Sequence, residues 1–360
     1  MTAEPARQPR GRRVRTLLTR LFQAFIVLCL IDGFVDIAYP ALGAAKAYVA
    51  RQFSDPRPSG PIEPGSIHDV LWPLPHLTLR EEPGIAGIAA EHRSPGTTVD
   101  ADGRRSNGLP APEKPEAVGL VLGSSAAFGF GIADDHTLSA HLERALGTVR
   151  IDNYAGLLQP LADTTLRWWD LQRRNGKPDF VIIAGASLDL YIACVPPPPV
   201  STTRNALLFL AERLTAKASS PKDTPCQSEH SMELAVRHAI QAVQNAVSLG
   251  RQQGVPFYIV LLPTPYDAGV NVENLRDNPH FKAAVDRLRP AYRRYHEELA
   301  KLDLPEFIDL SQVLPPEGMY LIDAGAHLSG EGNALIAARL AERIRSDGAR
   351  GLLPASLSAR

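Results

Sequence analysis

The sequence is poor in cysteine, and its few cysteines do not form a metal-binding pattern. Only 3 occur among 360 residues, without the Cys-x-x-Cys or Cys/His spacing of a zinc site. Cys29 lies in an apolar run near the N-terminus, whereas Cys194 and Cys226 flank an irregular stretch with four consecutive prolines. In an oxidising compartment these two could form a disulfide. The alternative is a pair of free thiols.

The sequence also lacks an excess of charge of either sign. Lys and Arg number 38 against 39 Asp and Glu, which gives a net charge of −1 and a pI of about 6.8. A general nucleic-acid binder needs a basic face to displace phosphate counterions, so we expect no nucleic-acid partner. Nucleotide-binding loops, cofactor motifs and internal repeats are absent as well. We therefore expect neither a cofactor nor a metal.

Apolar residues make up 44% of the chain, enough for one large domain with additional segments or for two modest domains. The 31 prolines cluster, which indicates extended connecting segments rather than helices. These clusters lie at 56–64, 73–83, 110–115 and 196–199. We predict a basic tail (1–20), an anchor (21–39), a proline-rich linker and lead-in (40–115) with little regular periodicity, and a main domain (116–350) with an insertion (194–231).

The N-terminus predicts a membrane anchor. The run 21–39 is largely apolar and close to the ~20 residues that a helix needs to cross a bilayer, although Asp32 and Asp36 interrupt it. Six arginines precede it, so we expect the N-terminus in the cytoplasm and the domain outside the inner membrane, periplasmic or extracellular. A signal peptide cleaved among the small residues at 41–47, or a helix of a soluble protein, are the alternatives.

Beyond residue 115, short apolar runs alternate with stretches of helical spacing. This alternation predicts right-handed crossovers in a three-layer, flavodoxin-like α/β domain, with about five parallel strands and helices on both faces. The strands are expected at 117–122, 149–154, 180–184, 257–262 and 307–310. The helices are expected at 137–146, 161–174, 232–253, 281–301 and 331–345.

Ligand sites in such sheets lie beyond the carboxyl ends of the strands, which directs attention to the residues that follow each strand. Ser125 follows the first strand in a glycine-rich turn, and Asp323 and His327 follow the last. Together they can supply a nucleophile, an orienting carboxylate and a base. In the alternative interpretation Ser125 only caps a helix and His327 is an ordinary surface residue.

Two sequence blocks resemble those of the SGNH (GDSL-like) hydrolases. The stretch 123–131, with Gly123-Ser124-Ser125, resembles the first block, and 323–333 resembles the last, Asp-x-x-His block. The lead-in 100–105, ending in Arg105, is similar to the Asn-x-x-Gly-Phe-Arg element of membrane-anchored bacterial members. The resemblance covers about residues 97–346 and implies the flavodoxin-like SGNH fold.

The resemblance also implies residue roles. Ser125 would attack an ester carbonyl, His327 would take its proton, and Asp323 would orient His327. The amides of Ser125 and Gly156 and the side chain of Ser187 would stabilise the oxyanion.

The sequence departs from the family in three places. Ser124 replaces the usual aspartate, and Asp323 lies four residues before His327 instead of three. The third block, Gly185-Ala186-Ser187, has no asparagine.

The expected function is an exported serine ester hydrolase that removes acyl groups, such as acetyl, from an envelope glycan or a similar small ester. One alternative is an O-acyltransferase for exopolysaccharide, which passes the same acyl group to a sugar hydroxyl and works with a membrane-bound acyl-transfer partner. The other is a catalytically silent envelope domain that binds a glycan or a protein. The missing asparagine favours this last interpretation.

Overall fold

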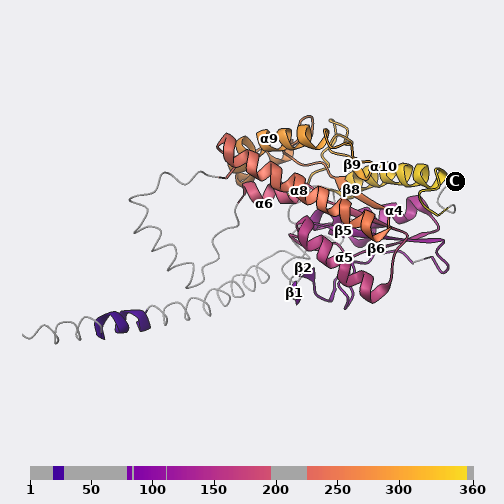
Figure 1. Ribbon diagram of the computed structural model, residues 1–360, viewed down its shortest axis with the longest axis horizontal. Coiled ribbons are helices and arrows are strands. Elements are labelled where there is room, and N and C mark those ends of the chain that lie inside the picture. The colour runs from indigo at the N-terminus through magenta and orange to yellow at the C-terminus, as the bar shows by residue number, and fades with distance from the viewer. Residues whose placement is uncertain (1–18, 28–78, 83–84, 111, 196–224, 355–360) are drawn as a thin grey trace, which may run out of the picture. The chain divides into compact units, whose positions relative to one another are not determined.

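A computed structural model describes residues 19–27, 79–82, 85–110, 112–195 and 225–354 (Figure 1). The chain divides into two compact units, residues 1–60 with 197–222 and residues 61–196 with 223–360. In the first unit, 19–27 form a helix whose apolar side chains are exposed, among them Phe22 and Phe25. Among the helices of the described residues, none has both the length and the hydropathy to span a membrane. Residues 28–39 of the predicted anchor lie outside the described residues.

The second unit is built on a five-stranded sheet with the order β6-β5-β7-β8-β9, in which every neighbouring pair is parallel. This is the flavodoxin-like order, so the predicted fold class is confirmed. The strands are β5 (Ala117–Gly123), β6 (Val149–Asn153), β7 (Phe180–Ala184), β8 (Phe257–Leu261) and β9 (Phe307–Asp309). All five agree with the predicted strands to within one residue at each end.

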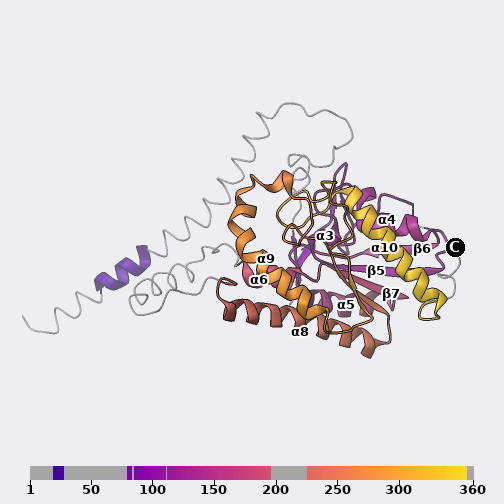
Figure 2. The same ribbon diagram turned by 90° about the horizontal axis from the view of Figure 1, so that it is seen from above.

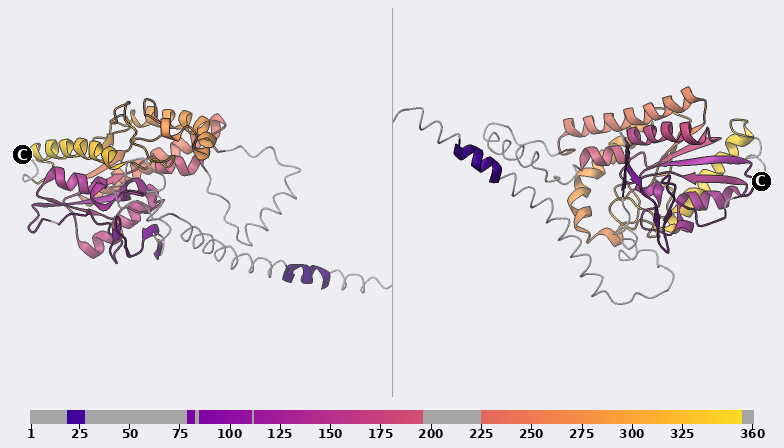
Figure 3. Two further views of the ribbon diagram at one scale, coloured as in Figure 1. Left: turned by 180° about the vertical axis from the view of Figure 1, so that it is seen from behind. Right: turned by 90° about the horizontal axis from the view of Figure 1, so that it is seen from below.

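Helices cover both faces of the sheet. Figures 2 and 3 show α4 and α10 on one face and α5 and α8 on the other. Because both faces are covered, every residue of β7 and β8 is buried, which explains why these strands read as unbroken apolar runs. The main helices are α4 (Leu138–Leu146), α5 (Leu161–Asn175), α8 (Glu229–Gln253), α9 (Pro279–Leu299) and α10 (Gly330–Ala349).

Side-chain caps set where several of these helices begin. The Thr137 hydroxyl accepts from the Ala140 amide at 3.2 Å at the start of α4, and Ser329 accepts from the Gly332 amide at 3.1 Å at the start of α10. Helix α8 begins at Glu229, earlier than predicted, because Ser228 and Ser231 form a reciprocal capping box. These bonds satisfy amides that have no partner inside the helix.

The lead-in to the sheet is more regular than its sequence suggests. Strand β1 (Leu79–Glu82) pairs with β2 (Ile85–Ala89), and β3 (His92–Arg93) pairs with β4 (Thr98–Val99), both antiparallel. The Arg105 amide then donates to the Asn153 carbonyl at 2.8 Å, on the open edge of β6. The expectation of little regular structure is therefore wrong for this part. Strands β3 and β4 have two residues each, too few to produce a period-2 pattern.

A disulfide closes the predicted insertion. Helix α6 (Leu188–Cys194) ends at Cys194, which is bonded to Cys226 with the two Cα atoms 5.2 Å apart. Both cystine residues are buried. The sequence left open whether Cys194 and Cys226 form a disulfide or remain free thiols, and in the structure they form the disulfide. Residues 196–224, which the bond encloses, lie outside the described residues.

Candidate active site

The turn after β5 presents Ser125 at the carboxyl edge of the sheet. Gly123 has φ of +129°, and a Cβ built there would lie 1.9 Å from the Ala184 carbonyl oxygen. Only glycine accommodates both the angle and the approach. The chain passes the end of β7 at this point, and the Ser124 amide donates to the Ala184 carbonyl at 3.2 Å. Ser125 is the first residue of the short helix α3 (Ser125–Phe128), half-buried and reachable from solvent.

Arg105 fixes the loop that follows α3. Its guanidinium donates to the carbonyls of Phe128 at 3.3 Å, Gly129 at 2.9 Å and Ile132 at 2.7 Å, and it pairs with Asp134 at 2.7 Å. The residue is only 2% exposed. Burial lowers the pKa of Arg105, and the ion pair with Asp134 opposes that effect. Arg105 ends the lead-in element on which the resemblance partly depends. In the structure its side chain contacts the loop that follows the nucleophile, residues 129–134, which we call the nucleophile loop.

His327 is carried by a tight hairpin between β9 and α10. Leu321 and Leu328 form an antiparallel bridge, and the Ile322 amide donates to the His327 carbonyl at 2.9 Å. Ala326, inside the turn, has φ of +67°, which lies in the left-handed region. The Tyr266 hydroxyl donates to the Ala324 carbonyl at 2.9 Å and holds the turn from the β8 side.

The structure brings Ser125, His327 and Asp323 together in one chain of hydrogen bonds. Ser125 Oγ lies 2.8 Å from His327 Nε2, and His327 Nδ1 lies 2.6 Å from Asp323 Oδ2. Ionised Asp323 can only accept a hydrogen bond, so the imidazole proton belongs on Nδ1 and Nε2 is free to accept from the Ser125 hydroxyl. The additional residue between Asp323 and His327 is absorbed by the turn.

The environment of Asp323 keeps it ionised. Burial acts to raise the pKa of Asp323, but the hydrogen bonds from His327 and from the Gly325 amide outweigh burial and hold the pKa below its usual value. The Gly325 amide donates to Oδ1 at 2.8 Å and the His327 amide to the same oxygen at 3.3 Å. These two amides fix the carboxylate, leaving Oδ2 for the imidazole.

Phe130 adds a contact that the sequence analysis missed. Its ring stacks on the His327 imidazole, with centroids 4.4 Å apart and planes inclined by 26°. Phe130 lies in the loop that Arg105 holds, so the segment that carries Ser125 also contacts His327. Phe130 belongs to the same glycine-rich block as Ser125, but nothing in its spacing marks it as a neighbour of His327.

The predicted oxyanion donors have different surroundings. The Ser125 amide stands at the first position of α3, where no intrahelical acceptor exists. The Gly156 amide, to which the resemblance assigns an oxyanion role, donates instead to the Gly123 carbonyl at 3.0 Å. Ser187 is the N-cap residue of α6, and its hydroxyl makes no capping bond. Ser187 is 7% exposed.

Two polar residues near these strand ends have structural roles. The Asn153 side chain donates to the Ala127 carbonyl at 3.0 Å and accepts from the Ala155 amide at 3.1 Å. Asp189 accepts from the Leu161 amide at 3.0 Å at the start of α5, and burial raises the pKa of Asp189. Neither side chain reaches the triad through a hydrogen bond among the residues that the structure describes.

Comparison with known proteins finds similarity in the fold. No protein-family model matches the chain. No curated protein matches it. Among solved structures, it is similar to the lipase Lip_vut3 from a goat rumen metagenome, with 15% identity, a TM-score of 0.40, and coverage of 62% of this chain and 95% of that one. The acetyl xylan esterase AlAXEase gives 13% identity, a TM-score of 0.37, and coverage of 63% and 99%. A member of the lipolytic protein G-D-S-L family from Veillonella parvula DSM 2008 gives 10% identity, a TM-score of 0.35, and coverage of 63% and 97%.

The order and direction of the five strands agree with the fold that the resemblance to the SGNH (GDSL-like) hydrolases implies.

Proposed function

We propose that the chain is an SGNH-type serine ester hydrolase that removes acyl groups, such as acetyl, from a glycan of the cell envelope. The observation that carries the proposal is the relay from Ser125 Oγ to His327 Nε2 at 2.8 Å and from His327 Nδ1 to Asp323 at 2.6 Å. A serine within hydrogen-bond reach of a base that is itself oriented by a carboxylate is the arrangement of an activated nucleophile.

In the proposed reaction, Ser125 Oγ attacks the ester carbonyl as its proton passes to His327 Nε2. Ionised Asp323 stabilises the imidazolium that forms. The carbonyl oxygen becomes an oxyanion, which accepts from the Ser125 amide and from the Ser187 hydroxyl. His327 then protonates the departing alcohol, leaving an acyl-serine. A water molecule gives a proton to His327, attacks the acyl carbon and releases the acid, and the proton returns to Ser125.

Two observations support a location outside the cytoplasm. The apolar run 21–39 follows an arginine-rich flank, as expected for an anchor with a cytoplasmic N-terminus. The bond between Cys194 and Cys226 is typical of oxidising compartments. A reporter fused after residue 45 should be active only when exported, and activity of a cytoplasm-only reporter at that junction would contradict the proposed topology.

The test of the nucleophile is covalent labelling with a serine-directed fluorophosphonate probe. The wild-type protein should be labelled at Ser125 in proportion to time and probe concentration, and Ser125→Ala should not be labelled. Ser139→Ala is the matched control, since Ser139 is a buried serine of α4 whose hydroxyl bonds to Asn153. Equal labelling of wild type and Ser125→Ala would refute the proposed nucleophile.

Two observations favour a second candidate, a catalytically silent envelope domain that binds glycan or protein. The Gly156 amide is engaged with the Gly123 carbonyl, and the block 185–187 after β7 has no asparagine, so two donors expected from the family resemblance are missing. If wild type and Ser125→Ala are equally inactive over a panel of acetyl esters and acetylated glycans, the silent domain becomes the better proposal.

A further inference from the structure

A second site lies at the carboxyl ends of β8 and β9, apart from the triad. It is a cavity of about 660 Å³ between the loop that follows β8, helix α9 and the loop that follows β9. None of the triad residues lines it. Its volume is that of ordinary small-ligand sites, and this edge of the sheet is where such folds bind ligands.

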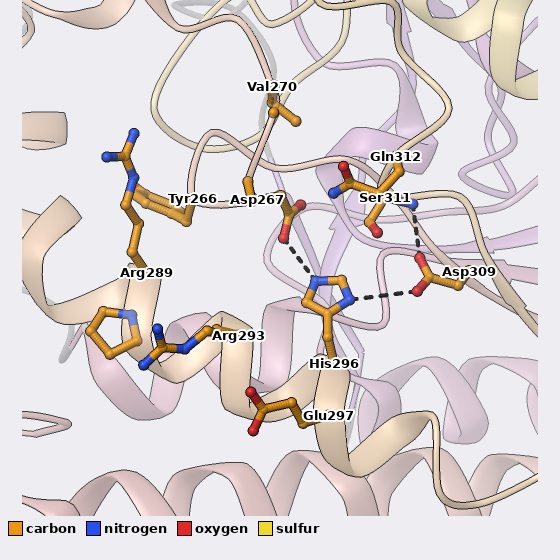
Figure 4. A pocket seen from close by; sticks show the side chains of 13 residues that line it. Tyr266, Asp267, Val270, Arg289, Arg293, His296, Glu297, Asp309, Ser311 and Gln312 are labelled. Carbon is orange, nitrogen blue, oxygen red and sulfur yellow. Dashed lines mark hydrogen bonds and ion pairs between the residues drawn. The ribbon is translucent and has the colours of Figure 1, made fainter.

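One side of the cavity is an ionic cluster centred on His296. Its Nε2 lies 2.8 Å from Asp267 Oδ1 and its Nδ1 lies 3.5 Å from Asp309 Oδ2 (Figure 4). Burial acts to lower the pKa of His296, but the hydrogen bonds with Asp267 and Asp309 raise it to about 9. The Asp267 side chain is 1% exposed and also accepts from the Thr264 amide and hydroxyl. Asp309 is half-exposed and can accept from a ligand hydroxyl.

The other side carries two arginines. Arg289 and Arg293 stand one turn apart on α9 and are both exposed, and in Figure 4 their side chains leave the helix on the side away from His296, in different directions. No ion pair links either of them to the other residues drawn around the cavity. The neighbouring Arg294, by contrast, pairs with both Glu229 and Glu298. Like charges one turn apart disfavour a helix, and a bound carboxylate would relieve that repulsion.

Between the two sides, the wall is partly apolar. Val270 and Pro290 contribute carbon surface, and Gln312 adds an exposed amide. Tyr266 also lines the cavity, but the residue is only 3% exposed and its hydroxyl donates to the Ala324 carbonyl. A sugar ring offers C–H groups to such a wall and hydroxyls to an amide or carboxylate.

We propose that this cavity binds the carboxylate-bearing sugar unit of an acidic polysaccharide, with the carboxylate on the side of Arg289 and Arg293 and the hydroxyls toward Asp309 and Gln312. The cavity carries positive charge on one side and carboxylates on the other, and this arrangement favours such a sugar over a small inorganic anion. A phosphate ion would gain only the arginines and would meet the carboxylates of Asp309 and Glu297, which also line the cavity. A uronic acid can place its carboxylate on the arginine side and donate from its hydroxyls to the carboxylate side.

Tyr266 connects the cavity to the triad, because the residue lines the one and its hydroxyl holds the hairpin of the other. The identity of this polymer as the ester substrate rests on the proposed function, whereas binding to the cavity does not.

The test is isothermal titration calorimetry of the full-length Ser125→Ala protein in detergent, with trigalacturonate as probe and the neutral maltotriose as its control. The Ser125→Ala background keeps binding separate from hydrolysis. Trigalacturonate should bind and maltotriose should not, and added salt should weaken binding. The double substitution Arg289→Gln with Arg293→Gln should lower the affinity at least tenfold. Arg294→Gln, the same change on the same helix outside the cavity, should lower it less than twofold.

Several results would overturn the proposal. They are absence of trigalacturonate binding, equal binding of the two trisaccharides, an equal loss in Arg294→Gln, or complete displacement by equimolar inorganic phosphate. Hydrolysis of aryl esters by the wild-type protein is measured separately, so failure of the cavity and failure of the triad give different outcomes.

Discussion

Replacing Asp323 by asparagine tests the proton arrangement of the triad directly. The asparagine is nearly isosteric, and its oxygen can still accept from the Gly325 amide, so the hairpin should keep its shape. Its NH₂ group would then face His327 Nδ1, which in the wild type lies 2.6 Å from a carboxylate oxygen. A donor at that place requires Nδ1 to accept, which moves the imidazole proton to Nε2. In that tautomer Nε2 cannot take the proton of Ser125.

The expected loss is about 1,000- to 10,000-fold in kcat, which corresponds to roughly 4–5.5 kcal/mol of transition-state stabilisation. The assay is hydrolysis of a short-chain aryl ester by the full-length protein, with the unfolding midpoint measured in parallel. Glu233→Gln is the control: it also turns a carboxylate into an amide, in an exposed ion pair with Arg237 on α8. Activity of Asp323→Asn within tenfold of wild type would refute the tautomer argument.

Three further outcomes are expected. Ser125→Ala and His327→Ala should each abolish nearly all turnover, and the double variant should lose little more, because the pair acts as a unit; additive losses in the same aryl-ester assay would contradict this. Thiol titration of the denatured, unreduced chain should find the free thiol of Cys29 but not those of Cys194 and Cys226, and removing the disulfide should lower the unfolding free energy by ~3–4 kcal/mol; three titrating thiols would show that the bond is absent. Because the pKa of His296 is raised from 6.5 to about 9, its contribution to stability is complete below about pH 6.5 and is lost as the pH rises through about 9. Urea unfolding should show a fall of roughly 3 kcal/mol across this window in the wild type, which His296→Gln lacks, and parallel curves for the two proteins would count against the pairing.

The regular part of the fold could be predicted because its signals are local. Strands β5, β7 and β8 are short, largely apolar runs, and their burial on both faces produces that pattern. Short elements carry too few residues for a pattern. The pair β3–β4 has two residues per strand, and α6 adjoins the proline-rich stretch, so neither was predicted.

In the candidate site, too, features with a local sequence signal could be predicted and features that depend on contacts in space could not. Positions after strand ends pointed to Ser125 and His327, whose side chains meet in the structure. The sequence could not tell that the Gly156 amide is engaged by the Gly123 carbonyl, since competition between backbone acceptors depends on how two turns meet in space. The spacing of Asp323 looked unfavourable because the family places the aspartate three residues before the histidine and not four; in the structure the turn takes up the additional residue, with Ala326 in the left-handed region.

The buried guanidinium of Arg105 has a consequence for where a shortened form of this protein can begin. A fragment starting at residue 116 would keep the five-stranded sheet and the triad, yet the carbonyls of Gly129 and Ile132 would lose their donor. Each buried acceptor left unsatisfied costs about 1–3 kcal/mol. The loop that carries Phe130 would also lose the hydrogen bonds that Arg105 donates to it. The smallest fragment with an ordered nucleophile loop should therefore start upstream of β3, well before the first strand of the sheet.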